Sequence, residues 1–352
     1  MSATLVQELP HSPGVWAAAW KRLKNDRVGM VALGITLLFI LMVVLAQVGV
    51  IAKDWQKEVG TAFAPPHVVG KIVDGSTTAV VEGTAGANVD LSDVDPLAPR
   101  YKEWFEAAAK VKTATVVKAD TLIFGGDQLG RDVLSKVVKG AQVSITVGLI
   151  AAVLATVIGT VLGAIGGYFG GKAGDFLEWV YNVFTSIPYI LLMFSVAAVL
   201  KSGPLANVLG SGVWTVIIIL SVVGWTGIYR LVRAEYIKHR SREYVRAAEA
   251  IGASHAARMF VHILPNISHV VLVQLSLHVV SFIKAEVILS FLGLGVPIDM
   301  VSWGTMLSEA QNELVQGKWW QLAAATAFMA TFVTAFALLT DALRDALDPK
   351  LR

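Results

Sequence analysis

The 352-residue sequence contains no cysteine and little charge, since Asp, Glu, Lys and Arg together make up 16% of the residues. Without cysteine, the chain can form neither disulfides nor cysteine-based metal sites. Soluble globular proteins average about 25% charged residues, whereas 55% of the residues here are hydrophobic. The composition therefore indicates a protein whose helices lie in lipid.

The sequence also lacks the common motifs of catalysis. The stretch GGYFGGKA at 166–173 has the Gly-xxxx-Gly-Lys spacing of a phosphate loop, but Ala173 stands where Ser or Thr would bind Mg²⁺. The seven histidines form no His-Glu-xx-His pattern, and no Gly-x-Ser-x-Gly elbow is present. We therefore expect no catalytic residue, no metal site and no cofactor bound by this chain. Helix packing and a turn account better for 166–173.

Six stretches are long and apolar enough to cross a bilayer, which takes about 20 mostly apolar residues as a helix. They cover 28–51, 140–171, 179–200, 202–229, about 268–296, and 319–340. Pro188 predicts a kink in the third stretch. The second contains overlapping Gly-xxx-Gly repeats from Gly159 to Gly171, which predict close helix–helix contact.

The first apolar stretch is expected to be a retained anchor, because it is longer than the core of a cleaved signal peptide, which is about 7–15 residues. Before it, Trp16 and Trp20 lie four residues apart beside Lys21 and Arg22. This pattern predicts a helix in the membrane interface that leads into the first span.

Lys and Arg in short loops predict the orientation, because they accumulate on the cytoplasmic side. The short loops after the third and fifth stretches contain one basic residue each, Lys201 and Lys318. The N-terminal tail, the loop after the fourth stretch and the C-terminal tail contain many more: Lys21, Arg22, Lys24 and Arg27; Arg230, Arg233, Lys238, Arg240, Arg242, Arg246 and Arg258; Arg344, Lys350 and Arg352. Both termini and this loop are therefore expected in the cytoplasm.

Residues 52–139 form the one long external segment. Short β-branched runs at 71–73 and 77–81 predict small strands, and 99–111, with Trp104 and Phe105, predicts a helix. We expect a small extracytoplasmic insertion.

Lys284 and Glu286 interrupt the fifth stretch. Charges within a bilayer are candidates for function, and these two would lie towards the outer face on different sides of the helix, because they are two residues apart. They either take part in the substrate path, or snorkel or line a wet cavity at the outer rim.

The segment EYVRAAEAIGASHAARMFVHILPN at 243–266 is predicted to form two short helices. Gly252 provides the hinge between them, Ser254 caps the second, and Pro265 ends it or begins the next helix. Val245, Ala248 and Gly252 (or Ile251) would form a ridge of small residues that enters a partner's groove. The residues alone are equally consistent with a basic connector on anionic lipid.

Part of this segment resembles the EAA loop of ABC-importer permeases, which reads Glu-Ala-Ala-xxx-Gly followed after nine residues by Ile-x-Leu-Pro. Ala247, Ala248, Gly252, Leu264 and Pro265 match the motif, whereas Arg246 replaces its Glu and His262 its Ile. The ending His-Ile-Leu-Pro-Asn is typical of the dipeptide/oligopeptide/nickel branch.

Three further stretches resemble the same branch. They are GGDQLGRDVLSKVVKGAQVS at 125–144, with Gly126 for Thr and Gln142 for the usual Arg; EVILSFLGLGVP at 286–297, followed by Ser302-Trp303-Gly304; and TDALRDALDPKLR at 340–352. The resemblance covers about 15–50 and 120–352. Residues 52–120 match nothing in the branch that we can place.

The resemblance implies an all-α membrane protein with six transmembrane helices, the type I ABC-importer permease fold, and an extracytoplasmic insertion after the first helix. The expected divisions are a cytoplasmic tail with the interfacial helix (1–27), the first transmembrane helix (28–51), the insertion (52–139), a five-helix core (140–343) containing the cytoplasmic coupling loop 235–266, and a cytoplasmic tail (344–352).

The resemblance also implies partners in a bacterial plasma (inner) membrane. These are membrane lipid, a second homologous permease, two ABC ATPase subunits that use ATP and Mg²⁺, and an extracytoplasmic substrate-binding protein; no nucleic acid is expected. The residues expected to couple to the ATPase are Tyr244, Arg246, Ala247, Ala248, Glu249, Gly252, Ala253, Ser254, Arg258, Leu264 and Pro265. Candidates for a substrate path or outer gate are Lys284, Glu286, Asp127 and Arg131.

The expected function is that of a permease subunit forming half of the pore of an ATP-driven importer for di- or oligopeptides. Nickel, opine or glutathione-like cargo is the alternative within this class. An autonomous secondary transporter or channel is the alternative outside it, but such proteins commonly carry inverted repeats and mid-membrane ion-coupling charges.

Overall fold

The computed structural model describes residues 15–70, 100–110, 118–202, 212–297 and 299–347. The chain divides into two compact units, and each is described by itself. Unit 1 combines Met1–Trp55 with Val133–Arg352, and unit 2 is Gln56–Asp132. Among the described residues every regular element is a helix, and β pairing is limited to isolated bridges. The expectation of an all-α protein is confirmed.

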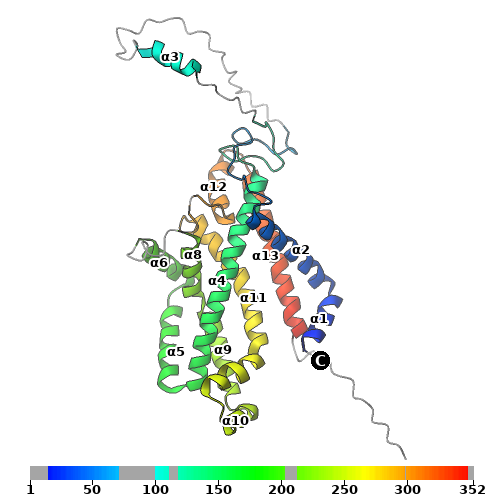
Figure 1. Cartoon of the computed structure of the whole chain (residues 1–352), viewed down its shortest axis with the longest axis vertical. Coiled ribbons are helices and arrows are strands. Elements are labelled where there is room, and N and C mark those ends of the chain that lie inside the picture. Colours follow the sequence, from blue (N-terminus) through cyan, green and yellow to red (C-terminus); the bar gives the residue numbers. More distant parts are fainter. Residues whose placement is uncertain (1–14, 71–99, 111–117, 203–211, 298, 348–352) are drawn as a thin grey trace, which may run out of the picture. The chain divides into compact units, whose positions relative to one another are not determined.

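The long helix α4 (Val133–Phe169) is the centre of unit 1 (Figure 1). Seven other helices contact it: α2 (Arg27–Val48), α5 (Gly171–Thr185), α8 (Val213–Gly224), α9 (Thr226–His239), α11 (Leu264–Phe291), α12 (Trp303–Val315) and α13 (Trp320–Leu347). The first turns of α12 pack beside the beginning of α4, because the Trp303 indole donates to the Val137 carbonyl. The other end of α4 lies beside the segment 243–266, where Tyr168 contacts His255.

The glycine repeats of α4 form a smooth face for α9. A Cβ atom on Gly159, Gly163 or Gly167 would lie 2.5–2.8 Å from a backbone carbonyl oxygen of residue 225, 229 or 233 respectively. Because backbone cannot move aside as a side-chain end can, only glycine permits this approach. The predicted close helix–helix contact is confirmed, and its partner is α9.

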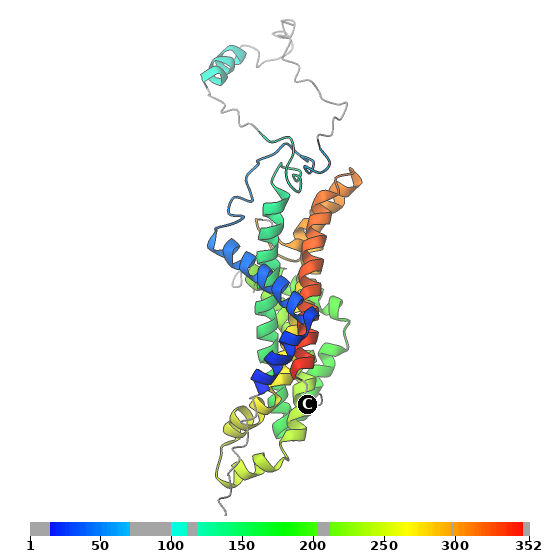
Figure 2. The same ribbon diagram turned by 90° about the vertical axis from the view of Figure 1, so that its right-hand side faces the viewer.

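Four helical stretches among the described residues are long and apolar enough to cross a membrane, and two bent helix pairs raise the number to six if each pair is one span. The four are α2, α4, α13 and a continuous stretch, Ala257–Phe291, that includes α11. α4 begins at Val133, so residues 133–139, assigned from the sequence to the external segment, extend this helix. Figure 2 shows α4 and α13 running side by side along unit 1.

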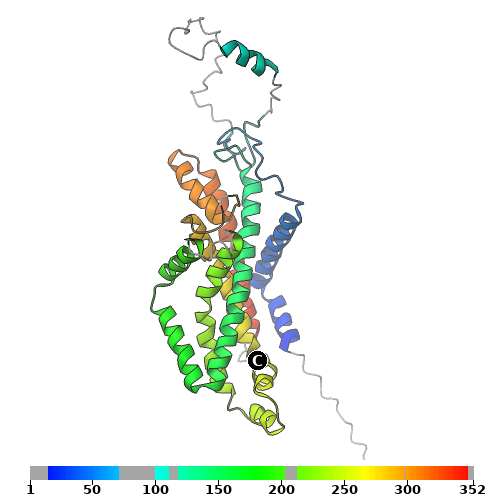
Figure 3. The same ribbon diagram turned by 60° about the vertical axis from the view of Figure 1, so that its left-hand side comes forward.

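The first bent pair surrounds Pro188. Helices α5 and α6 (Tyr189–Ser202) meet at an angle of 95° (Figure 3). Proline cannot donate a backbone hydrogen bond and drives the preceding residue out of helical geometry. The Ser186 hydroxyl binds the Val183 carbonyl and so satisfies one of the groups that the break frees. The predicted kink is confirmed, and it separates two helices.

The second bent pair is α8 and α9, with a bend of 42° between them. The sequence placed the end of this apolar stretch at 229, but α9 continues to His239. Its last part is charged on one side only, because Ile228, Val232 and Tyr236 recur every four residues and are buried. This amphipathic spacing extends the helix beyond the apolar stretch.

The N-terminal part of unit 1 forms α1 (Val15–Asn25) and α2. Asp26 separates them, and its carboxylate accepts from the Val28 amide at 3.0 Å as an N-cap. α1 confirms that a helix precedes the first apolar stretch, and α2 packs on α13.

Unit 2 contains α3 (Tyr101–Lys110), which confirms the helix predicted over 99–111. Backbone hydrogen bonds pair the two ends of unit 2 with each other. The Thr61 amide donates to the Ala119 carbonyl at 3.0 Å, and the His67 amide donates to the Leu122 carbonyl at 2.8 Å. The strands predicted at 71–73 and 77–81 lie outside the described residues.

Candidate functional site

The segment 243–266 begins with α10 (Glu243–Ala250), which is attached to unit 1 by one face. Val245 and Ala248 are buried, and Val245 packs in a cluster with Tyr236, Met259 and Ile263. The ridge that the sequence assigned to a partner's groove is therefore divided: Val245 and Ala248 hold α10 to its own chain, whereas Ile251 and Gly252 are exposed.

Gly252 ends α10 in a Schellman motif. Its amide donates to the Glu249 carbonyl and the Ala253 amide to the Ala248 carbonyl, both at 2.9 Å. Gly252 has φ +87°, and an added Cβ would meet nothing within 4 Å. The turn therefore needs glycine for its left-handed backbone conformation and not for lack of space.

Ser254 caps the next helix as predicted, because its hydroxyl accepts from the Ala257 amide at 3.2 Å. The expectation of a second short helix is wrong: a π-helix, η2 (Ala257–Ile263), passes without a break into α11. Pro265 directly follows η2, in the first turn of α11. The preceding π-helix has a different hydrogen-bond register from an α-helix.

Leu264 and Pro265, two of the expected coupling residues, differ in their burial. Leu264 is partly buried against the cluster around Tyr236, and Pro265 is exposed at the surface. At the start of α11, Leu264 therefore faces the core of unit 1, whereas Pro265 faces the surface.

The outward face of α10 presents Arg246, Ala247, Ala250 and Ile251. Ile251 is 84% exposed, which is unusual for an isoleucine at a helix end. Among the described residues, the Arg246 side chain has no ion pair or hydrogen-bond partner. This face therefore offers a short apolar tip flanked by an uncompensated cation.

Arg258 holds the two halves of the segment together. Its guanidinium lies 2.6 Å from the Glu249 carboxylate and 2.9 Å from His255 Nδ1, and it stacks over the Tyr168 ring. Because a guanidinium only donates, His255 Nδ1 is the acceptor. Arg258 is only 8% exposed, so it serves this internal contact, whereas Glu249 remains accessible.

Tyr244 lies on the exposed side of α10, with its hydroxyl 2.7 Å from His239 Nδ1. Partial burial raises the pKa of this hydroxyl, and the nearby Arg242 guanidinium lowers it by less. The phenol therefore stays protonated at neutral pH and can donate to His239, which ties α10 to the end of α9.

The two charges of α11 lie in different surroundings, as their spacing predicts. Lys284 is exposed, whereas Glu286 is fully buried, with the Ser290 hydroxyl donating to its Oε1 at 2.6 Å. Ser144 of α4 binds the Trp303 amide at the start of α12 and belongs to the same buried polar region. Glu286 thus lies at a helix junction and not on a wet rim.

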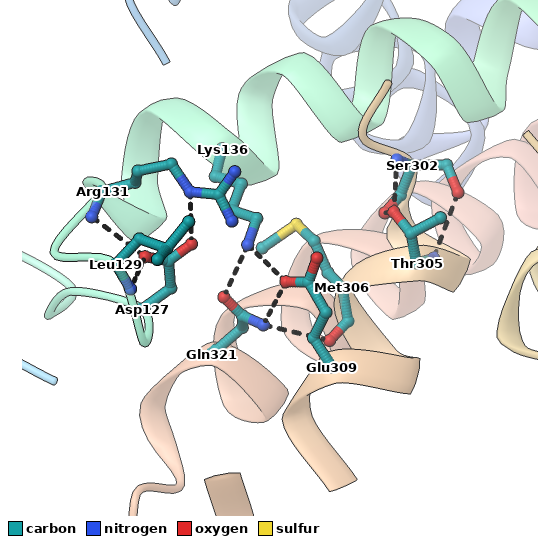
Figure 4. Close-up of polar contacts among 9 residues, drawn as sticks. All are labelled: Asp127, Leu129, Arg131, Lys136, Ser302, Thr305, Met306, Glu309 and Gln321. Carbon is teal, nitrogen blue, oxygen red and sulfur yellow. Dashed lines mark hydrogen bonds and ion pairs between the residues drawn. The ribbon is translucent and has the colours of Figure 1, made fainter. Parts of the chain in front are cut away.

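Asp127 and Arg131 form a closed loop in unit 2 (Figure 4). One Asp127 oxygen accepts from the amides of Leu129 and Arg131, and the other accepts from Arg131 Nε at 2.7 Å. Asp127 is fully buried. These contacts give the Asp-xx-Gly-Arg motif a structural role in its own loop.

A buried polar cluster of unit 1 was not singled out from the sequence. Lys136 of α4, which is 1% exposed, forms an ion pair with Glu309 of α12 and lies 3.2 Å from Gln321 of α13 (Figure 4). Gln321 also donates to Glu309. The signal was available, since Lys136 stands inside the apolar beginning of a helix, where charge is costly without a partner.

Within the described part of the chain, no group of three or more His, Asp or Glu side chains is arranged to hold a metal ion. The stretch 166–173 joins α4 to α5 through Gly170 and Gly171, both with positive φ, and no strand precedes it there. This is the turn between helices that the sequence favoured over a phosphate loop.

Residues 159–352 match the family described as binding-protein-dependent transport system inner membrane component. The chain belongs to this family. Residues 14–66 also match the N-terminal TM domain of oligopeptide transport permease C, which places the chain in the dipeptide and oligopeptide permease branch. The resemblance of the four motifs to this branch is confirmed. The sequence analysis was wrong for residues 52–66, which also lie within the second match.

Three curated relatives show how far this similarity extends. The chain is 34% identical over 255 residues to the oligopeptide transport system permease protein OppC of Bacillus subtilis, covering 72% of this chain and 80% of that protein. It is 34% identical over 229 residues to the dipeptide permease DppC of Bacillus subtilis, covering 65% and 69%. It is 40% identical over 229 residues to the glutathione permease GsiD of Salmonella typhimurium, covering 65% and 72%.

The family supports a multi-pass protein of an inner membrane that works with a substrate-binding protein and an ATPase. The permease is the transport component of such a system and not its catalytic subunit.

Proposed function

We propose that this permease forms half of the translocation pore of an ATP-driven importer for di- or oligopeptides. Its membership of the dipeptide and oligopeptide branch is the observation that carries this proposal. A second, homologous permease would complete the pore, two ATPase subunits would use ATP and Mg²⁺, and a binding protein would deliver the cargo.

The chain crosses the membrane six times in this proposal, with each bent helix pair counted as one span and both termini in the cytoplasm. The distribution of Lys and Arg supports this orientation. Contacts within unit 1 agree with it, since Gly29 near the start of α2 lies against Ala342 near the end of α13. Unit 2 would be extracytoplasmic, where it is accessible to the binding protein.

Coupling would pass through α10. Its outward face, with Arg246, Ala247 and Ile251, would lie in a groove of an ATPase subunit. Closure of the ATPases would displace α10, and Val245 and Arg258 would transmit this displacement to α9, α4 and the continuous helix that leads into α11. In this proposal α10 has two positions, and ATP bound to the ATPase subunits sets the equilibrium between them.

Glutathione-like cargo is a second candidate, favoured by the 40% identity to a glutathione permease. Because the binding protein selects much of the cargo in such systems, uptake by the complete importer distinguishes the two. A secondary transporter would need no ATPase, so ATP dependence separates the classes.

The test is co-expression with the partner permease, the ATPases and the binding protein, followed by ATPase and uptake assays in lipid. Dipeptides, longer peptides and glutathione are compared. We expect ATP-dependent uptake stimulated by the loaded binding protein; uptake without ATPases would overturn the proposal.

Replacement of Ile251 tests the coupling surface. Because this side chain is 84% exposed, Ile251→Asp should leave folding of the permease intact and weaken its association with the ATPases by tenfold or more. Val68→Asp, at a 95% exposed position of unit 2 away from the expected ATPase surface, is the control.

A further inference from the structure

A shallow apolar groove of about 620 Å³ runs between α2 and α13. Residues 27–35 of α2 and 330–338 of α13 line it, and all but Arg27, Thr331 and Thr334 are apolar. Val28, Val31 and Leu338 are well exposed at its rim. The groove therefore opens onto the surface of unit 1.

Small residues form the floor of the groove, where Ala32 and Ala335 are buried, and larger contacts close it at both ends. At one end a Cβ on Gly29 would lie 2.8 Å from Ala342 Cβ, so the helices are close. At the other end the Phe39 ring meets Phe328 and Phe332, with centroids 6.0 and 5.3 Å away. Small side chains at Ala330 and other positions between these contacts leave the space unfilled.

The dimensions of the groove suit a lipid chain. Residues 27–35 rise about 12 Å along α2 at 1.5 Å per residue. One half of the hydrocarbon core of a bilayer is about 15 Å thick. An acyl chain of a single leaflet would therefore lie along the groove, with its headgroup near Arg27.

The end of the groove at Arg27 is basic. Arg27 is exposed and forms no ion pair with a described residue. The neighbouring Asp26 carboxylate accepts from the Val28 amide, and neither Asp341 nor Asp345 of α13 forms an ion pair with Arg27 in the described chain. The Lys24 ammonium lies over the exposed Trp20 ring, 5.4 Å from the ring centroid. Basic and tryptophan side chains of this kind are typical of an interfacial helix. This charge complements an anionic headgroup.

We propose that the groove between α2 and α13 binds an anionic phospholipid of the cytoplasmic leaflet, with an acyl chain along the groove and the phosphate at Arg27. The assignment of the leaflet rests on the proposed orientation. A helix of the partner permease in the same groove is the competing occupant, and the experiment below separates the two.

The complete transporter is reconstituted in nanodiscs of phosphatidylcholine that contain a phosphatidylglycerol with a photoactivatable acyl chain, and adducts are mapped by mass spectrometry. We expect adducts concentrated in 27–35 and 330–338. Arg27→Gln should reduce phosphatidylglycerol adducts about fivefold, as expected for the loss of one cation near an anionic surface. Adducts of the corresponding phosphatidylcholine probe should change little.

Thr334→Trp fills the groove from its exposed side and should reduce adducts of both probes there. Lys172→Gln and Val44→Trp, at exposed positions outside the groove, are the matched controls for charge and bulk. Soluble glycerol phosphate should not compete, because it lacks the chain; competition would overturn the proposal in favour of a free-phosphate site.

Adducts spread evenly over α2, an Arg27→Gln variant that behaves like Lys172→Gln, or cross-links from the groove to the partner permease would each overturn the lipid site. Thermal unfolding of each variant shows that it is folded. Since labelling requires neither ATP hydrolysis nor uptake, its failure is separate from failure of the importer function.

Discussion

Gly252 illustrates how a single residue determines the shape of the coupling segment. Its left-handed φ of +87° lets two backbone hydrogen bonds close the end of α10 before Ser254 starts the next helix. The space around it is open, so a side chain would be resisted only by backbone conformation. The effect of a substitution should therefore follow conformational preference and not side-chain volume alone.

We predict that Gly252→Val abolishes uptake while membrane insertion stays normal. A β-branched residue in this conformation costs on the order of 1–3 kcal/mol, which is enough to alter a small exposed turn but not to unfold the bundle. Gly252→Asn should retain more activity, because Asn tolerates left-handed geometry. Gly34→Val, at a helical glycine with no neighbour within 4 Å, is the control; equal uptake by Gly252→Val and wild type would contradict the prediction.

Lys136 and Glu309 show a second residue-scale effect. The ammonium of Lys136 is buried, whereas Glu309 keeps 34% of its side chain exposed, and Gln321 contacts both. A buried ion pair contributes little net stability, but breaking one from a single side leaves an uncompensated charge.

We predict a coupling energy of about 1–3 kcal/mol between Lys136→Met and Glu309→Gln in a double-mutant cycle measured by unfolding in detergent. The double variant should be more stable than the sum of the single effects implies. The exposed pair Glu58–Lys118 is the control, and its coupling should stay below about 1 kcal/mol. Equal couplings for the two pairs would show that the burial of Lys136 is irrelevant.

At the scale of elements, the packing of α4 on α9 holds the bundle together and links it to α10. Gly163 faces the Tyr229 carbonyl, where a Cβ would lie 2.8 Å from the oxygen, and Val232 packs alongside. The same part of α9 supplies Tyr236, whose hydroxyl donates to the Met259 carbonyl of η2. Separation of α4 and α9 would therefore also disturb the base of the coupling segment.

We expect Gly163→Leu to reduce the yield of folded, monodisperse protein and to lower its melting temperature. Overpacking typically costs 1–3 kcal/mol, and more is expected where the neighbour is backbone. Gly34→Leu, at a helical glycine whose Cβ would meet nothing within 4 Å, should behave like wild type. A fully stable Gly163→Leu variant would show that α9 can move away from α4.

At the scale of the whole molecule, unit 2 consists of two end segments and the chain between them. The two ends of unit 2 are hydrogen-bonded to each other through Thr61–Ala119 and His67–Leu122. The chain between Gly70 and Lys118 can therefore be shortened without moving these pairs. A deletion that begins at residue 60 would instead remove them.

We predict that replacing 71–117 with a short Gly-Ser linker leaves membrane insertion, melting temperature and ATPase association unchanged. If unit 2 docks the binding protein, the affinity for that protein should fall by tenfold or more in pull-down or binding assays. Unchanged affinity and unchanged uptake would exclude this docking role. A scrambled 71–117 sequence of the same length controls for loop closure.

Several features were predictable because they depend on local sequence. The break at Pro188, the cap at Ser254 and the helix at 101–110 follow from residues within a few positions of each other. The continuation of α9 was missed although its amphipathic spacing is present in the sequence. The unbroken passage from η2 to α11 was missed because a change of hydrogen-bond register decided it.

The sequence by itself determined the membrane class, the family motifs and the positions of the turns, because composition, proline and glycine act locally. Only the tertiary structure decided which side of each helix is available. It turned Val245, Ala248 and Arg258 inwards, left Ile251 and Arg246 outside, and enclosed Lys136 and Glu286 at helix junctions. Burial depends on which distant segments pack together, and that cannot be obtained from the spacing of residues along one helix.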